Sequence, residues 1–269
     1  TGFDVLHGYR TLFPTPLAQA ASFNPELIET VERIAAREAA SAGVNWVYAP
    51  MLDIARDPRW GRIMEGGGES PWLSARIARA RIKGLQGDRL SDPDHVLACA
   101  KHFAGNGAVE GGRDYSATDL SLRALRDQEL PPFKAAAEAG IGCFMAAFNA
   151  PDGTPGITNH YLLETVLRRE WGFTGMVVSD FGATLELTVH GVAHNLEDSA
   201  GQAIQAGTDM DMQARAFVAH LPQLVRAGVI PEQTLDQAVQ RILTIKERLG
   251  LFDDPFALNR PFPLINDFK

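Results

Sequence analysis

The stretch YLLETVLRREWGFTGMVVSD, residues 161–180, contains one complete unit of the fold that we predict for this chain. A helical segment from Tyr161 to Trp171 leads into the apolar run Met176-Val177-Val178, which ends in Ser179-Asp180. A short apolar run without polar alternation is typical of a strand buried on both faces, as in a parallel sheet. The stretch therefore predicts a helix followed by a parallel strand that carries polar side chains at its carboxyl end.

The same alternation of helix and strand recurs on both sides of this stretch. Asn24-Pro25-Glu26 has the features of a helix start, namely a capping side chain, proline at the first helical position and an acid near the positive end of the dipole. We expect that helix to end at Gly43 and further helices near 72–85, 121–139 and 198–206. A C-terminal helix is expected to bury the stripe Leu235, Ala238, Ile242, Ile245 and Leu249.

Candidate strands occur at the N-terminus and at 45–49, 96–100, 141–148, 176–178 and, more weakly, 208–212, which makes about six. Repeated strand–helix units favour an α/β fold with a parallel sheet. We predict a (β/α)8 TIM-type barrel that lacks its first βα unit, with a doubly wound open sheet as the competing fold. The predicted barrel domain covers residues 1–252, and residues 253–269, with three prolines, are expected to form a linker.

Composition excludes several classes of function. A net charge of −8 argues against a nucleic-acid partner, because phosphate binding needs a surplus of Lys and Arg. No apolar run approaches the ~18 residues of a membrane span.

Cys99 and Cys143 lie in apolar runs and are expected to be buried free thiols. The chain begins at Thr1, without Met, and we expect it to be an internal fragment or a processed chain.

Polar side chains stand at the carboxyl ends of successive predicted strands. Strand-end side chains converge on one mouth of a barrel, where catalysis takes place. Taken singly, each Asp has a simpler interpretation as the cap of the next helix, and a lone His as a core residue. Their recurrence at successive strand ends favours an enzyme that acts on a polar small molecule. The residues concerned are Asp4, Asp53, Lys101, His102, Met145, Asn149, Asp180, Asp209 and Asp211.

Six motifs, in order along the chain, give a more specific indication. They are Phe3-Asp4-Val5-Leu6-His7-Gly8-Tyr9-Arg10-Thr11, Ala49-Pro50-Met51-Leu52-Asp53, Asp57-Pro58-Arg59-Trp60-Gly61-Arg62, Ala100-Lys101-His102-Phe103, Glu110-Gly111-Gly112-Arg113-Asp114-Tyr115 and Val178-Ser179-Asp180-Phe181-Gly182-Ala183. With these motifs the chain resembles family-3 glycoside hydrolases, and among them the bacterial periplasmic β-glucosidases. The resemblance implies a retaining exo-β-glycosidase that needs no cofactor or metal and is periplasmic or secreted.

The resemblance also assigns roles to individual residues. Asp180 matches the nucleophile that forms a covalent glycosyl-enzyme. Four residues match the clamp on the hydroxyls of the first sugar, and Met145 matches a residue that lines the same subsite. The clamp residues are Asp4, Arg62, Lys101 and His102.

The resemblance places the general acid/base outside this chain. In the family it is a Glu of an α/β-sandwich domain that follows the barrel, so we expect a second domain or chain as partner. Four carboxylates of this chain do not match that position: Glu65, Glu110, Asp114 and Glu186. A β-glucoside or small oligosaccharide is the expected substrate. The alternatives are a β-xyloside, an α-arabinofuranoside, less favoured a β-N-acetylhexosaminide, or a non-catalytic sugar-binding fragment.

Overall fold

The computed structural model describes residues 1–115 and 117–256, and within them five parallel strands form one curled sheet. The strands are β1 (Gly2–Phe3), β2 (Trp46–Val47), β3 (Leu97–Phe103), β4 (Cys143–Ala146) and β5 (Met176–Ser179). Their order in the sheet, β1-β2-β3-β4-β5, is the order of the chain. A doubly wound sheet requires a reversal of strand order, so that alternative is excluded. The α/β class is confirmed, and the described strands form a half-barrel.

The weakest predicted strand, 208–212, makes a single bridge between Met210 and Val178 instead of a strand. The cause is the side chain of Asp209, whose Oδ2 accepts the backbone N–H of Val177 at 2.8 Å. The Asp209 N–H donates in turn to the Val177 carbonyl at 2.8 Å. A carboxylate thus occupies the place that a backbone carbonyl would take in a regular ladder.

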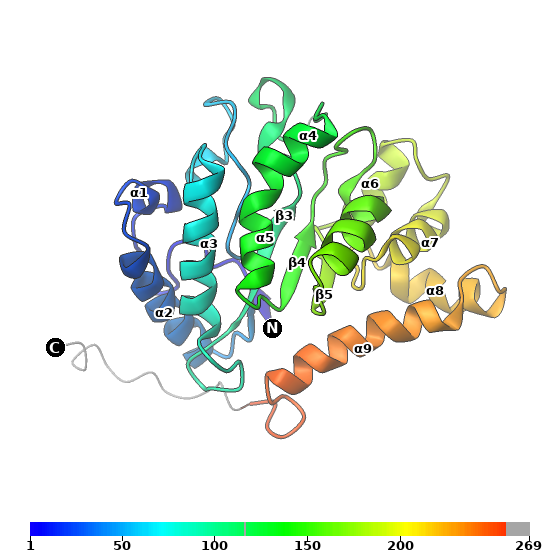
Figure 1. The fold of residues 1–269 in the computed structure, drawn as a ribbon. Coiled ribbons are helices and arrows are strands. Elements are labelled where there is room, and N and C mark those ends of the chain that lie inside the picture. The colour runs from blue at the N-terminus through cyan, green and yellow to red at the C-terminus, as the bar shows by residue number, and fades with distance from the viewer. Residues whose placement is uncertain (116, 257–269) are drawn as a thin grey trace.

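Helices cover the outer face of the sheet, and Figure 1 shows α3 and α5 in front of the strands, with α2 beside α3. The α-helices are α1 (Pro16–Ala20), α2 (Pro25–Ser41), α3 (Pro71–Gln86), α4 (Leu122–Ala124), α5 (Leu130–Glu138), α6 (Ala183–Val189), α7 (Leu196–Ala206), α8 (Ala216–Arg226) and α9 (Glu232–Arg248). Two π-helices are η4 (Leu125–Glu129) and η6 (Tyr161–Glu170). The 3-10 turns are η1 (Ile63–Glu65), η2 (Asn106–Ala108), η3 (Glu110–Gly112) and η5 (Gly156–Thr158).

Local side-chain chemistry explains where several helices begin and end. Asn24 caps α2 by accepting the Leu27 N–H at 3.0 Å, as predicted, and Gly43 follows the helix with φ of 83°. The predicted helix 121–139 is divided into α4, η4 and α5. Sequence periodicity did not predict α1, α6 or α8.

The two faces of the sheet are buried against different partners. Ala98, Phe144 and Val177 point into the large core shared with the outer helices. Alternate residues such as Cys99 and Cys143 point to the inner face, where Ile245 of α9 packs. The predicted stripe of α9 is confirmed, since its five residues are buried or half-buried. Both thiols are buried and free, as expected.

The predicted end of the barrel domain, at residue 252, lies shortly after the last residue of α9, Arg248. Residues 253–256 continue from the turn after α9, and residues 257–269 of the expected linker lie outside the described residues. Within the described part, no helix combines the length and apolarity that crossing a bilayer requires.

Candidate active site

A cavity of about 520 Å³ is formed at the carboxyl ends of the strands. Its walls contain all six residues that the sequence predicted for the site, so the structure brings the whole predicted set together. The lining residues are Asp4, Tyr48, Arg62, Lys101, His102, Tyr115, Met145, Phe148, Asp180, Phe181, Glu186 and Met212. Carboxylates, two cations, an imidazole and several aromatic rings therefore face one small volume.

Asp180 follows the last residue of β5 and is held by its own backbone surroundings. Its Oδ1 accepts the Phe181 N–H at 2.6 Å, and its carbonyl accepts the Ser179 hydroxyl at 2.9 Å. That hydroxyl also accepts the Met212 N–H at 2.8 Å, which ties the turn after β5 to the next loop. The buried Oδ2 has no hydrogen-bond partner among the described residues, and His102 Nε2 lies 3.5 Å from it.

The charge on Asp180 depends on a balance between burial and cationic neighbours. Burial raises the pKa of the Asp180 carboxyl, while His102, the Phe181 N–H, Lys101 and Arg62 oppose that rise. One oxygen is thus fixed by a hydrogen bond, and the other is buried beside the imidazole of His102, while Asp180 as a residue lines the cavity. This arrangement suits a carboxylate that attacks an electrophilic carbon.

His102 is fixed by a second carboxylate that does not line the cavity. Asp53 Oδ2 lies 2.7 Å from His102 Nδ1 and also accepts the backbone N–H of His102 at 3.0 Å. Burial raises the pKa of Asp53 to about 7 and lowers that of His102 to about 3. Because the two groups are in contact and buried, they titrate as a pair and share one proton between these values.

Sequence reasoning noted Asp53 at a strand end but did not assign it to the site. Asp53 is the last residue of the motif Ala49-Pro50-Met51-Leu52-Asp53, and its place in that motif is the sequence feature that could have assigned it to the site. Its connection to His102 joins β3 to the loop after β2, over 49 residues of chain. Asp53 therefore orients a cavity residue without contacting the cavity itself.

The two cationic side chains of the cavity each have a carboxylate partner. Lys101 Nζ lies 2.7 Å from Asp4 Oδ1, with the lysine side chain buried and that of Asp4 62% exposed. Arg62 makes two hydrogen bonds of 2.9 Å with the Glu65 carboxylate. The bidentate pair fixes the plane of the guanidinium, so its remaining N–H groups have a defined direction.

Aromatic rings form one side of the cavity. Tyr115 and Phe148 pack edge to face with ring centroids 5.0 Å apart, and Phe181, beside Asp180, is 63% exposed. Such rings provide apolar faces next to hydrogen-bonding groups, as an amphipathic sugar ring requires. The sequence prediction did not include these three rings or Glu186 among the site residues.

Two strand-end carboxylates have structural contacts instead and do not line the cavity. Asp209 is paired with Arg168 and Arg241, each at 2.8 Å. Asp211 accepts the N–H of Ala216 at the start of α8 and the Thr184 hydroxyl, at 2.8 and 2.6 Å. Asp211 thus fixes the start of α8 through the N–H of Ala216, although the N-cap position itself is Arg215.

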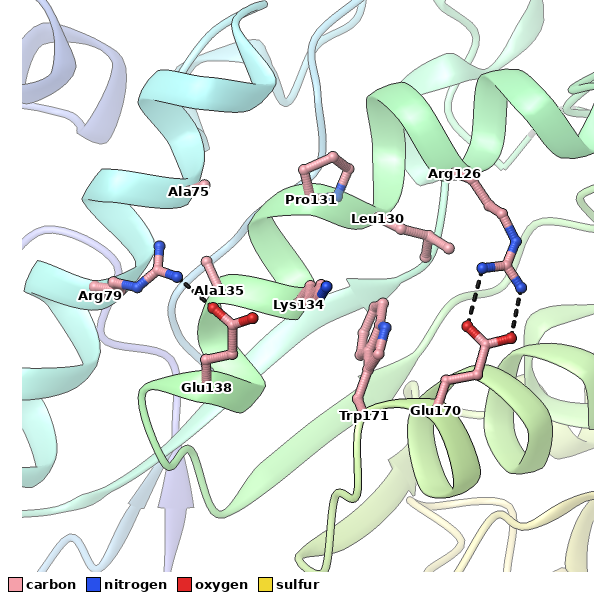
Figure 2. A pocket seen from close by; sticks show the side chains of 10 residues that line it. All are labelled: Ala75, Arg79, Arg126, Leu130, Pro131, Lys134, Ala135, Glu138, Glu170 and Trp171. Atoms are coloured by element: carbon pink, nitrogen blue, oxygen red, sulfur yellow. Dashed lines mark hydrogen bonds and ion pairs between the residues drawn. The ribbon is translucent and has the colours of Figure 1, made fainter.

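A second hollow lies on the outer helical face, and its charged side chains are largely engaged with one another. Figure 2 shows Arg126 in a bidentate pair with Glu170, at 2.9 and 2.7 Å, and Arg79 paired with Glu138. These residues come from α3, η4, α5 and η6, on the opposite side of the sheet from Asp180. Among the described residues, no cluster of three or more His, Cys, Asp or Glu has the arrangement of a metal site.

Comparison with known proteins identifies relatives along the whole described fold. The model of the glycosyl hydrolase family 3 N-terminal domain matches residues 1–245. A periplasmic β-glucosidase of Salmonella typhimurium is 44% identical over 255 residues, which are 95% of this chain and 33% of that protein. A β-xylosidase of Formosa agariphila is 39% identical over 259 residues, which are 92% of this chain and 36% of that protein.

Solved structures give the same result. The β-glucosidase of Listeria innocua in complex with isofagomine superimposes with a TM-score of 0.96 at 40% identity, covering 99% of this chain and 38% of that one. An exo-1,3/1,4-β-glucanase of a Pseudoalteromonas species superimposes with a TM-score of 0.88 at 34% identity, covering 97% and 33%. The chain thus spans about a third of the length of its relatives.

Proposed function

Because this chain belongs to glycosyl hydrolase family 3, we propose that the protein is a retaining exo-β-glycosidase with Asp180 as its nucleophile. The substrate is a terminal non-reducing β-D-glucosyl residue of a β-glucoside or small oligosaccharide. The observation that carries the proposal is that Asp180 lines the cavity, with one carboxylate oxygen held by the Phe181 N–H and the other buried without a hydrogen bond among the described residues.

The reaction has two steps. A carboxylate oxygen of Asp180 attacks the anomeric carbon, the glycosidic C–O bond breaks, and the leaving oxygen takes a proton from a general acid. Water then gives a proton to the same group, now acting as a base, and attacks the anomeric carbon. The bond to Asp180 breaks, which frees the carboxylate and yields the sugar with its original configuration. Asp4, Arg62, Lys101 and His102 bind sugar hydroxyls, and Met145 lines the same subsite. The cationic members of this set also favour the ionised form of Asp180.

The general acid/base is supplied from outside this chain, by an α/β-sandwich domain in the same polypeptide or in a partner. The proportion of the relatives that this chain spans, about a third, supports that part of the proposal. Residues 1–252 then form a (β/α)8-type barrel domain without its first βα unit, and residues 253–269 form the linker. The name of the Salmonella relative supports a periplasmic or secreted location.

A β-xyloside is the second candidate substrate, because a relative at 39% identity is named a β-xylosidase. Measuring kcat/KM for matched aryl β-glucoside and aryl β-xyloside decides between them. A non-catalytic sugar-binding role predicts no cleavage of either, although such activated leaving groups need little acid assistance.

The test of the mechanism is Asp180→Asn in the full-length protein, with Glu186→Gln as the matched control on the same cavity wall. Loss of the nucleophile is expected to lower the rate by several orders of magnitude, whereas Glu186→Gln keeps covalent catalysis. Asp180→Gly with added azide should release a glycosyl azide of inverted configuration. An Asp180→Asn variant with a tenth or more of the wild-type rate would contradict the proposal.

A further inference from the structure

Sulfur-containing side chains form a row on the inner face of the sheet. Cys99 on β3 is in register with Cys143 on β4, and Cys143 is in register with Met176 on β5. Residues paired in register on neighbouring strands point to the same face, so the three side chains lie next to one another. All three are buried.

More sulfur surrounds this row. Met145, Met210 and Met212 pack in the same cluster, which therefore contains both cysteines and four of the six methionines of the chain. Apolar packing alone would be satisfied equally by Leu, Ile or Val. Thiolate and thioether sulfur are, however, the ligands that soft cations such as Cu(I) select.

The spacing of the row matches a two-coordinate soft cation. Neighbouring strands lie about 4.7–4.9 Å apart. Two metal–thiolate bonds of about 2.3 Å each span roughly 4.6 Å when they are collinear. Where the Cys99 and Cys143 side chains project in parallel, their sulfur atoms are separated by about the strand spacing, so one ion fits between them, with Met176 at the next register position.

The surroundings of the row contain groups that favour a bound thiolate. The Trp46 side chain packs against the same cluster, and its indole N–H has no hydrogen-bond acceptor among the described residues. Lys101, two residues after Cys99 on the same face of β3, adds a positive charge next to the row.

The cavity wall adjoins the sulfur cluster. Met145 and Met212 belong both to the cavity wall and to the sulfur cluster. Met145 stands two residues after Cys143 on β4, one side-chain layer nearer the cavity. The sulfur cluster is therefore continuous with the cavity wall.

We propose that Cys99 and Cys143, with Met176, form a binding site for a soft monovalent cation of the Cu(I) class. On binding, the two S–H bonds give way to two sulfur–metal bonds, the two protons pass to solvent, and the metal keeps its oxidation state. The site lies beneath the cavity and is separate from the proposed sugar chemistry.

The test uses Ag(I), a redox-inert probe with the same charge and ligand preference, and the full-length protein in chloride-free buffer. Native mass spectrometry is expected to show one tightly bound ion per chain, with release of about two protons. Loss of a residue that only contacts a metal ligand costs roughly 10–100-fold in metal affinity. Cys99→Ala and Cys143→Ala each remove a ligand itself, so each should weaken Ag(I) affinity by more than that. Met64→Leu, an exposed methionine outside the cluster, is the control and should bind as wild type.

X-ray absorption at the silver edge supplies a measurement that needs no variant. A shell of sulfur neighbours in the wild-type protein supports the site, and a shell of nitrogen and oxygen alone overturns it. Affinity unchanged in both cysteine variants overturns it as well. Because binding is measured without substrate, the result is independent of whether the protein proves to be a glycosidase.

Discussion

The contact between Asp53 and His102 leads to a prediction about stability and activity together. The perturbation is Asp53→Asn, which keeps the shape of the side chain and removes its charge. In the wild-type protein the buried pair holds one proton between a pKa of about 3, that of His102, and about 7, that of Asp53. In the unfolded chain the ordinary pKa values of 3.8 and 6.5 also leave one proton on the two groups over most of that range. The wild-type pair therefore contributes little pH dependence to stability between pH 5 and about 6.5.

In Asp53→Asn the folded and unfolded states no longer bind equal numbers of protons at these two positions. Its only titrating member is His102, whose pKa burial keeps below the unfolded value of 6.5. Below that value the unfolded state binds more protons than the folded state, so stability is lost as the pH falls. Each pH unit is worth about 1.4 kcal/mol, and from pH 6.5 to 5 the loss approaches about 2 kcal/mol.

The assay compares denaturation midpoints at pH 7 and pH 5 for wild type, Asp53→Asn and the control Asp57→Asn. Asp57 is paired with Arg59 at the surface, and hydrogen bonds from Arg59 lower the pKa of its carboxyl to about 2. Its stabilising effect is therefore lost only as the pH falls from about 4 towards 2, outside the measured range. A variant whose midpoint falls no more than that of wild type between pH 7 and 5 would refute the reasoning.

The same substitution tests the positioning of His102. Loss of a charge-assisted hydrogen bond costs about 1.5–3 kcal/mol, which corresponds to about a 10- to 150-fold decrease in kcat/KM. The pH–rate profile of Asp53→Asn should also shift, because the shared proton is lost, whereas a purely structural defect lowers the rate at all pH values alike.

The remaining predictions concern the sugar clamp, the core and the missing acid. Arg62→Ala and Lys101→Ala should each lower kcat/KM about 10- to 100-fold; an equal loss for a deoxy substrate that lacks the contacted hydroxyl would indicate a structural role. Phe133→Ala should destabilise the protein by about 3–5 kcal/mol, because this buried ring packs on Phe103 and Phe144, while Leu12→Ala, at an exposed position, should change the denaturation midpoint little. Residues 1–269 expressed alone should hydrolyse cellobiose weakly compared with the full-length protein, because two carboxyl groups are needed; comparable turnover would mean that the acid/base lies within the chain.

The sequence determined the elements whose signals are local. Asn24 and Pro25 predicted the start of α2, since a cap and a fixed φ act within one helical turn. The stripe of α9 was likewise legible in the spacing of its apolar residues. The six predicted site residues line one cavity because they end strands or belong to motifs at strand ends, and the parallel sheet brings such positions to one edge.

Tertiary structure alone decided the features that depend on residues distant in the chain. Whether 208–212 forms a strand depended on Asp209 reaching Val177, and no local pattern reports such a contact. The roles of Asp53 and Asp211 were indistinguishable in sequence, because both are acids near a strand end. Asp53 orients His102, whereas Asp211 accepts the first N–H of α8. A side chain's partner is fixed by the packing of separate strands and helices and not by its neighbours in the chain.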